Sequence, residues 1–294
     1  MSAFNPRLTP ARPDLAAMSL RGLVDAPRFV EGTTTIIFDG AADLRRAPVP
    51  DALLDTEALH GEIFVEYERD DEGWSWGQLE RDSYVGYIPS KALTRDLASP
   101  THRVAVLRSF LYGGPSIKVP PMAALSLGSR VTIVDHKDQF AITDTALRKL
   151  AAGYRGHCII ADHLVPMNQT EHDFVAVAER FLGVPYYWGG KTSLGLDCSA
   201  LVQLSLDAAG ILAPRDSHVQ ESILGQALPI DREFSGLRRG DLIFWKGHVA
   251  IMRDEHMMIH ASGHQMLVVS EPLRVAAQRI ADKGAGPVTA IKRF

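Results

Sequence analysis

The sequence predicts a multidomain protein in which two small β-barrels precede an α+β domain. Two stretches of roughly 60 residues carry short alternating strands separated by turn residues, and they end in similar motifs. Two helical patterns and several short strands follow, an order that is typical of α+β domains. With 294 residues, the chain is long enough for two or three domains that each bury a core.

The first barrel is predicted within residues 31–98. Its strands are expected in segments 33–40, 61–80 and 83–93, and the stretch EIFVEY shows the alternation of a half-buried strand. A hairpin turn is predicted at three residues that favour turns, Asp70, Asp71 and Gly73. Gly86 lies inside a strand pattern, which predicts a bend or a close approach of another backbone.

The second barrel is predicted at residues 99–166, and residues 1–30 are expected to form a polar, proline-bearing arm that lies on the rest of the molecule. The two barrels end alike, because Tyr84-Val85-Gly86 is matched by Tyr154-Arg155-Gly156. This match indicates a weak internal repeat.

The α+β domain is predicted at residues 167–294. Thr170 is expected to cap a first helix with Asp173 three residues on, and Gly183 and Pro185 are expected to end it. A second helix is predicted from Cys198 to Ala209, followed by Gly210, and short strands are predicted in the segments GDLIFW, HVAIMRD, MMIHAS and MLVVSEP.

Composition excludes several classes of protein. A formal charge of −4 does not indicate binding to nucleic acid or to an anionic membrane. No segment approaches the roughly 18 apolar residues of a membrane span. The first residues lack the apolar run of a signal peptide, so a cytoplasmic, soluble protein is expected. The two cysteines, Cys158 and Cys198, form no disulfide or metal pattern, and Cys158 is expected to be a small buried hydrophobe.

Cys198 follows a glycine-rich loop and opens a predicted helix. Asp197 is a natural N-cap, and the backbone N–H groups and dipole of a helix start lower the pKa of a thiol, as a nucleophile needs. Three glycines of the loop let the backbone approach a substrate, Gly189, Gly190 and Gly195. These residues alone fit a nucleophile and a buried structural cysteine about equally well.

Two histidines offer a base for such a nucleophile. If the strands around Arg253-Asp254-Glu255 form a hairpin, His248 stands opposite His260 with Cβ atoms about 5 Å apart. One imidazole can accept the thiol proton while the other fixes its tautomer and orientation. The spacing of His256, His260 and His264 also fits a zinc site, but no acidic residue completes an HExxH-type motif, so no metal or cofactor is expected.

The stretches PYYWGGKTSLGLDCSALV, GDLIFWKGHVAIM and MIHASG resemble the NlpC-type cell-wall peptidases, which are papain-like cysteine hydrolases. The resemblance covers roughly residues 168–294, and the upstream repeat resembles bacterial SH3-type barrels. It implies Cys198 as nucleophile, His248 as general base, His260 as orienting residue and Tyr186 as support of the oxyanion site. The sequence departs from the family at Ala200, where glycine is common.

A subfamily with two such barrels resembles dipeptidyl-peptidases that cleave the γ-D-glutamyl–diamino acid bond of murein tripeptides and tetrapeptides with a free N-terminal L-alanine. The resemblance implies peptidoglycan recycling by a monomer, with Asp197 holding the ammonium and Tyr84 closing the pocket behind it. The implied substrate contacts are Tyr84, Asp197, Ser199, Asp216, Ser217 and, as a further ammonium partner, Glu57. Two alternatives stay open: an amidase or acyltransferase of the same fold, and a non-catalytic adaptor that binds wall fragments.

Overall fold

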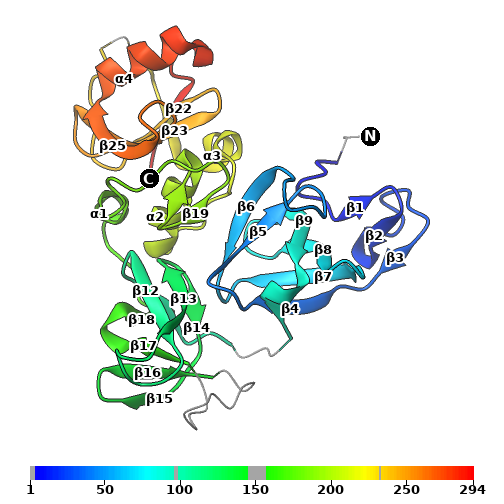
Figure 1. Ribbon diagram of the computed structural model, residues 1–294. Coiled ribbons are helices and arrows are strands. Elements are labelled where there is room, and N and C mark those ends of the chain that lie inside the picture. Colours follow the sequence, from blue (N-terminus) through cyan, green and yellow to red (C-terminus); the bar gives the residue numbers. More distant parts are fainter. Residues whose placement is uncertain (1–3, 96–98, 145–156, 232) are drawn as a thin grey trace. The chain divides into compact units, whose positions relative to one another are not determined.

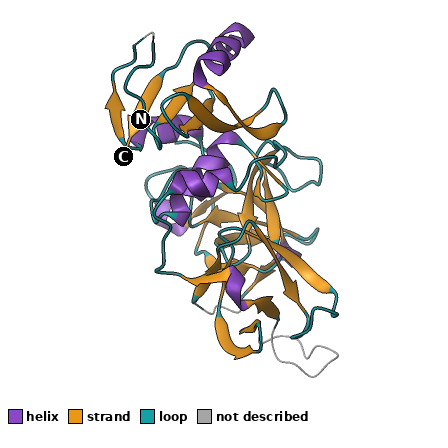
Figure 2. Ribbon diagram, turned by 90° about the vertical axis from the view of Figure 1, so that its left-hand side faces the viewer, coloured by secondary structure: helices purple, strands orange, loops and turns teal. Residues whose placement is uncertain are grey.

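The computed structural model describes residues 4–95, 99–144, 157–231 and 233–294. The chain divides into two compact units, Met1–Met167 and Asn168–Phe294. Strands dominate the N-terminal unit, whereas the four α-helices of the described residues all belong to the C-terminal unit. Figure 2 colours the helices purple and the strands orange. No helix in the described part of the chain is long and apolar enough to cross a membrane.

A seven-stranded antiparallel sheet forms the first barrel, with strand order β10-β4-β7-β8-β9-β5-β6 (Figure 1). Its strands are β4 (Thr33–Ile37), β5 (Ala41–Arg45), β6 (Leu54–Leu59), β7 (Ile63–Arg69), β8 (Trp74–Leu79), β9 (Val85–Pro89) and β10 (Leu93–Thr94), with a 3-10 turn at Ser90–Ala92. All three predicted strand segments are confirmed, while β5 and β6 were not predicted because DLR and DTEAL carry no clear alternation.

Alternating residues of these strands build the barrel core, which includes Ile37, Leu44, Phe64, Leu79 and Ile88. Burial of each such side chain contributes about 1.5–3 kcal/mol. The predicted hairpin turn is confirmed: Asp70 Oδ1 accepts from the backbone N–H groups of Glu72 and Trp74, and Gly73 has a φ of +92°. The predicted close approach at Gly86 is also confirmed, because a Cβ there would lie 2.7 Å from the Arg45 carbonyl oxygen.

The N-terminal arm packs against this barrel. It forms a small sheet of β1 (Ala11–Arg12), β2 (Leu15–Ala17) and β3 (Phe29–Val30), with a 3-10 turn at Met18–Leu20. Leu15 is wholly buried and clusters with Trp76 and Val85, and the Val85 N–H donates to the Arg7 carbonyl at 2.8 Å.

The remaining part of the N-terminal unit holds two further sheets, with strand orders β14-β11-β18 and β13-β12-β17-β16-β15. Their strands are β11 (His102–Val104), β12 (Arg108–Tyr112), β13 (Pro121–Ser126), β14 (Arg130–Val131), β15 (Ile133–Lys137), β16 (Phe140–Thr143), β17 (Cys158–Ile160) and β18 (Leu164–Pro166), with a 3-10 turn at Ala161–His163. Cys158 is wholly buried, as predicted, and burial raises its pKa. The repeat motif at Tyr154 and Gly156 lies outside the described residues.

The C-terminal unit contains a six-stranded antiparallel sheet with order β21-β26-β22-β23-β24-β25. These strands are β21 (Gln226–Leu228), β22 (Leu242–Trp245), β23 (His248–Met252), β24 (Met257–Ser262), β25 (Leu267–Pro272) and β26 (Ala290–Arg293), and a separate pair is β19 (Lys191–Thr192) and β20 (Gly195–Leu196). The four predicted strand segments correspond to β22–β25. They are confirmed, while β21 and β26 were not predicted.

Four α-helices accompany this sheet: α1 (Phe174–Glu179), α2 (Cys198–Ala208), α3 (Ser217–Ile223) and α4 (Leu273–Ile280), which continues into a π-helical turn at Ala281–Ala285. Helices α1 and α2 lie side by side, and α2 contacts β23 and β24 (Figure 1). Leu273 and Ala276 of α4 share a core with Trp245 and Met258 of the sheet.

The predicted second helix is confirmed, but the predicted cap of the first helix is wrong. Asp173, not Thr170, is the N-cap of α1, because its Oδ1 accepts from the N–H groups of Val175 and Ala176. Asp173 immediately precedes the apolar stripe and its carboxylate also pairs with Arg239, so it competes better than a hydroxyl three residues earlier.

We expect Gly86→Ala to destabilise the first barrel by about 1–3 kcal/mol, because the added methyl group overlaps the Arg45 carbonyl. Hydrogen exchange of the full chain measures this locally: amides of β8 and β9 should lose protection while those of β23 and β24 keep theirs. Unchanged protection in β9 would contradict the close packing at this position.

Candidate active site

Cys198 is the first residue of α2 and is only 6% exposed. Asp197 caps the helix, as predicted, by accepting from the Ala200 N–H at 2.9 Å. The expected lowering of the thiol pKa is wrong: burial and then the Asp197 carboxylate raise the pKa of Cys198 to about 12, although the backbone N–H of Val249 lowers it. Burial and the neighbouring carboxylate destabilise the thiolate by more than the N-terminus of the helix stabilises it. The resting side chain is therefore a thiol.

The thiol lies next to β23, because the backbone N–H of Val249, the residue after His248, interacts with it. His248 Nε2 and His260 Nδ1 are 2.6 Å apart, and the rings meet edge to face. The structure therefore brings together the two histidines that the sequence predicts as base and orienting residue.

The predicted register between their strands is wrong by two residues. Ile251 pairs with Ile259 and Met252 with Met258, a register that sets Ala250 rather than His248 across from His260. The cause is the turn: Asp254 Oδ1 accepts from the N–H groups of His256 and Met257, so His256 belongs to the turn and β24 begins one residue later. A shift of two residues keeps each side chain on its face, and for that reason the two imidazoles still meet.

The histidine pair continues into two residues that sequence reasoning did not identify. His260, which is 2% exposed, contacts Glu271 Oε1 through Nε2 at 2.8 Å. Glu271 in turn accepts two hydrogen bonds from Arg279 of α4, at 2.6 and 2.7 Å. Burial alone would raise the pKa of Glu271, but the hydrogen bonds from His260 and Arg279 outweigh it and lower the pKa to about 2.

These hydrogen bonds determine the tautomers of both histidines. An ionised Glu271 can only accept, so His260 Nε2 carries a proton, and with the proton there the other ring nitrogen, Nδ1, can accept a hydrogen bond. His248 must therefore donate from Nε2, which leaves the lone pair of its Nδ1 as the base. Burial and the neighbouring His260 lower the pKa of His248 to about 3, so the imidazole is neutral at rest and its protonation is disfavoured.

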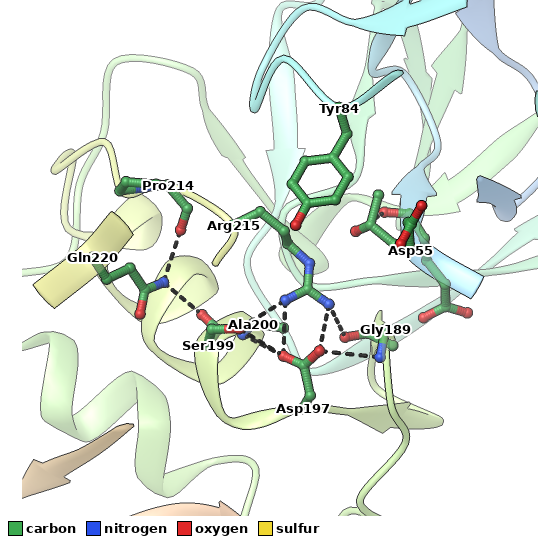
Figure 3. Close-up of polar contacts among 12 residues, drawn as sticks. Asp55, Tyr84, Gly189, Asp197, Ser199, Ala200, Pro214, Arg215 and Gln220 are labelled. Atoms are coloured by element: carbon green, nitrogen blue, oxygen red, sulfur yellow. Dashed lines mark hydrogen bonds and ion pairs between the residues drawn. The ribbon is translucent and has the colours of Figure 1, made fainter. Parts of the chain in front are cut away.

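A buried ion pair holds the loop in front of the nucleophile (Figure 3). Arg215, with a side chain only 2% exposed, binds Asp197 in a bidentate manner at 2.8 and 2.7 Å. Arg215 also donates to Ser199 Oγ and to the Gly190 carbonyl, and the Gly189 N–H donates to Asp197 Oδ2. One guanidinium thus links the glycine-rich loop to the first turn of α2.

Tyr186 lies in the same unit, and its backbone N–H donates to the Met266 carbonyl at 2.9 Å. Burial, followed by the proximity of Cys198 and Asp197, raises the pKa of its phenol. The phenol therefore keeps its proton and can act as a hydrogen-bond donor, which fits the predicted support of an oxyanion.

The other predicted contact residues divide between the two units. Asp216 is the residue before α3 and Ser217 is its first residue, while Gln220 of the same helix donates to the Ser199 carbonyl at 2.9 Å. Tyr84 belongs to the core of the first barrel, where its hydroxyl accepts from Arg7 at 2.9 Å. Glu57 lies in β6 across from Asp43. The substrate roles of these residues stay predictions.

Sequence reasoning missed Arg215, Glu271 and Arg279. Arg215 directly precedes Asp216 and Ser217, which were predicted as substrate contacts, and this position was the signal that could have identified it. Glu271 has a weaker signal, because it becomes visible only once His260 is known to pair with Val269, two residues away on the same face. Within the described residues, no group of three or more histidine, cysteine or acidic side chains is placed to hold a metal.

A cysteine at a helix start beside two hydrogen-bonded histidines is the arrangement of a cysteine hydrolase. Residues 183–280 match the model of the NlpC/P60 family, and residues 44–93 match that of the bacterial dipeptidyl-peptidase Sh3 domain. The chain therefore carries an NlpC/P60 domain behind a bacterial SH3-type domain, which confirms the predicted resemblance. A second domain of the SH3 type at residues 99–166 stays a prediction.

Curated relatives share part of the chain. It is 32% identical to dipeptidyl-peptidase 6 of Lysinibacillus sphaericus over 50% of this chain and 55% of that protein. It is 28% identical to the gamma-D-glutamyl-L-lysine dipeptidyl-peptidase of Bacillus cereus over 65% of this chain and 60% of that protein. The chain thus spans little more than half the length of these relatives.

Solved structures show the same fold. A crystal structure of an NlpC/P60 family protein from Bacillus cereus superposes with a TM-score of 0.69 at 22% identity, covering 89% of this chain and 99% of that one. An NlpC/P60 endopeptidase from Photobacterium damselae superposes with a TM-score of 0.61 at 14% identity, over 88% of this chain and 71% of that one.

The lowered pKa of His248 predicts that the free energy of unfolding falls as the pH drops from about 6.5 towards 3. In this window the unfolded chain binds a proton at His248 that the folded chain does not, so protonation favours unfolding. His248→Gln should flatten the pH dependence, whereas His256→Gln, at an exposed position, should leave it as in the parent protein. Chemical denaturation at a series of pH values measures this, and identical slopes for the parent and His248→Gln would contradict the assignment.

Proposed function

We propose that this protein is a cysteine endopeptidase that cleaves the γ-D-glutamyl–diamino acid bond of murein peptides with a free N-terminal L-alanine, in peptidoglycan recycling. The observation that carries the proposal is the series of hydrogen bonds from His248 through His260 to Glu271, on strands that pack against the helix that begins with Cys198. The choice of bond is supported by the similarity to the gamma-D-glutamyl-L-lysine dipeptidyl-peptidase of Bacillus cereus.

The geometry supports a two-step acyl transfer. His248 Nδ1 accepts the thiol proton as Cys198 attacks the γ-glutamyl carbonyl, and the imidazolium then protonates the leaving amine. Because both neutral forms are favoured at rest, the proton moves only as the carbon–sulfur bond forms. Glu271 stabilises the developing positive charge through His260, and water then releases the acyl group with His248 again as base.

Oxyanion stabilisation is proposed from two donors, the backbone N–H of Cys198 and the phenol of Tyr186. The start of α2 presents N–H groups that no helical carbonyl satisfies, and the Tyr186 phenol keeps its proton.

Recognition of the free amine is proposed to involve Asp197 and, as a further ammonium partner, Glu57, with Tyr84 closing the pocket behind the amine. Asp197 already accepts five hydrogen bonds, from Arg215 twice and from Gly189, Ser199 and Ala200. A substrate ammonium would share one of these oxygens with the groups that already donate to it. It would therefore bind a carboxylate whose negative charge Arg215 already partly neutralises. We further propose that residues 99–166 form a second barrel, supported by their two sheets around the core of Leu111, Leu125 and Ile159.

Mass spectrometry of L-Ala-γ-D-Glu-diaminopimelate, with and without an acetyl cap on the alanine, tests this proposal. We expect release of L-Ala-D-Glu from the free peptide alone and none with Cys198→Ala, because the nucleophile is lost. Cys158→Ala is the matched control and should retain activity, since that thiol is buried in the other unit.

Cleavage of both peptides would support the peptidase activity but contradict the proposed exclusion of capped substrates. Cleavage of neither, with transfer of another acyl group to an added amine, would favour an acyltransferase instead.

Glu271→Ala is expected to lower kcat/KM by about tenfold to a hundredfold, because His260 loses the partner that fixes its tautomer and balances the imidazolium charge. Glu271→Gln should recover part of this loss, since its carbonyl oxygen can still accept from His260 Nε2. Steady-state kinetics with Glu255→Gln, in an exposed turn, as control separates this effect from a general loss of negative charge. Equal rates for Glu271→Ala and the parent would show that Glu271 does not support His248 and His260 in the reaction.

A further inference from the structure

Gln220 of α3 joins two segments of the candidate active site through one amide group (Figure 3). Its wholly buried side chain donates from Nε2 to the Ser199 carbonyl at 2.9 Å and to the Pro214 carbonyl at 2.7 Å. Two carbonyl oxygens can bond only to the donor end of the amide, so both of its protons are used. Ser199 directly follows the nucleophile and Pro214 directly precedes Arg215, so one side chain links the nucleophile's helix to the segment of the buried ion pair.

The peptide group between Ser199 and Ala200 is held at both ends. Its carbonyl accepts from Gln220, while its N–H donates to Asp197 Oδ1 at 2.9 Å. The Ser199 hydroxyl is held as well, since it donates to Asp197 and accepts from Arg215. Ser199 is therefore fixed at its carbonyl and at its hydroxyl in the first turn of α2.

The orientation of Ser199 affects the nucleophile directly. Burial raises the pKa of the Cys198 thiol, and the backbone N–H of Ser199 is one of the groups that lower it. An N–H that points at the sulfur stabilises the negative charge that develops there as the proton leaves. This support depends on direction, because a hydrogen bond weakens steeply as its angle falls towards about 120°.

We infer that Gln220 is a positioning residue for the nucleophile, because it holds the first turn of α2 in the orientation that supports the Cys198 sulfur. It acts through Ser199 rather than on the substrate, and the inference rests on the proposed function, in which Cys198 is the attacking group. Helix α3 also contacts β23, the strand that carries His248, so the helix of Gln220 packs against the elements of both the nucleophile and the base.

A second buried glutamine offers a matched control. Gln203 of α2 is also wholly buried, and its Nε2 donates to the Ala213 carbonyl at 3.1 Å, one residue before the carbonyl that Gln220 holds. The two side chains agree in type, in burial and in the segment that they contact. Only Gln220 is bonded through its side chain to the turn that begins with Cys198.

Gln220→Met keeps the length of the side chain and removes both donors. With L-Ala-γ-D-Glu-diaminopimelate, we expect kcat and kcat/KM to fall together by about threefold to tenfold, because the lost bonds support the transition state and not substrate binding. Gln203→Met should leave both constants unchanged. Gln220→Glu should lie between the parent and Gln220→Met, since a buried carboxyl group favours its protonated form and then keeps one donor.

Alkylation of Cys198 by iodoacetamide at pH 8 measures the thiol without a peptide, in a Cys158→Ala background. Its rate constant follows the thiolate fraction and should fall by about threefold to tenfold in Gln220→Met, but not in Gln203→Met. Denaturation midpoints of all variants show that each is folded under the conditions of the assay.

Equal changes in the two Met variants, or an alkylation rate that Gln220→Met leaves as in the parent, would reduce Gln220 to a packing residue and overturn the inference. If the parent protein fails to cleave the peptide, the proposed function is wrong. The alkylation rates then still decide whether Gln220 positions the thiol.

Discussion

The buried pair of Arg215 and Asp197 joins the segments from which the site is built. Its guanidinium reaches the glycine-rich loop through Gly190 and the first turn of α2 through Ser199, while Asp197 caps the helix that begins with Cys198. Both charges are desolvated, and a buried pair that loses one partner costs about 3–5 kcal/mol because the other charge is left uncompensated. The position of the nucleophile therefore depends on a contact between residues 18 apart in the chain.

The same pair imposes an electrostatic compromise on the thiol. The Asp197 carboxylate raises the pKa of Cys198, while Arg215 and the backbone N–H groups of Val249 and Ser199 lower it. Burial decides the outcome, so the ionised sulfur is disfavoured before substrate binds. In the proposed reaction, proton transfer to His248 accompanies attack by the thiol, and the orientation of that ring is secured by hydrogen bonds that reach as far as α4.

Local patterns were sufficient to predict the helix that begins at Cys198, its cap at Asp197, the four central strands and the pairing of two histidines on one face. They were insufficient for the register, because Asp254 turns the backbone in a way that alternation does not reveal. Arg215, Glu271 and Arg279 resemble solvated surface charges in the sequence, and only the packing of distant segments buries their contacts. The pKa of Cys198 was mispredicted because burial depends on the whole fold and outweighs the helix start.

The hydrogen-bonded chain from His248 to Arg279 crosses three neighbouring strands and a helix, with one member from each of β23, β24, β25 and α4. A slip of one residue in any of these strands would turn its member to the opposite face and break the chain. The His248 tautomer is thus fixed only when these three strands and α4 have come together. A partly folded chain would therefore lack the oriented pair of His248 and His260, so this site forms only together with the tertiary structure around it.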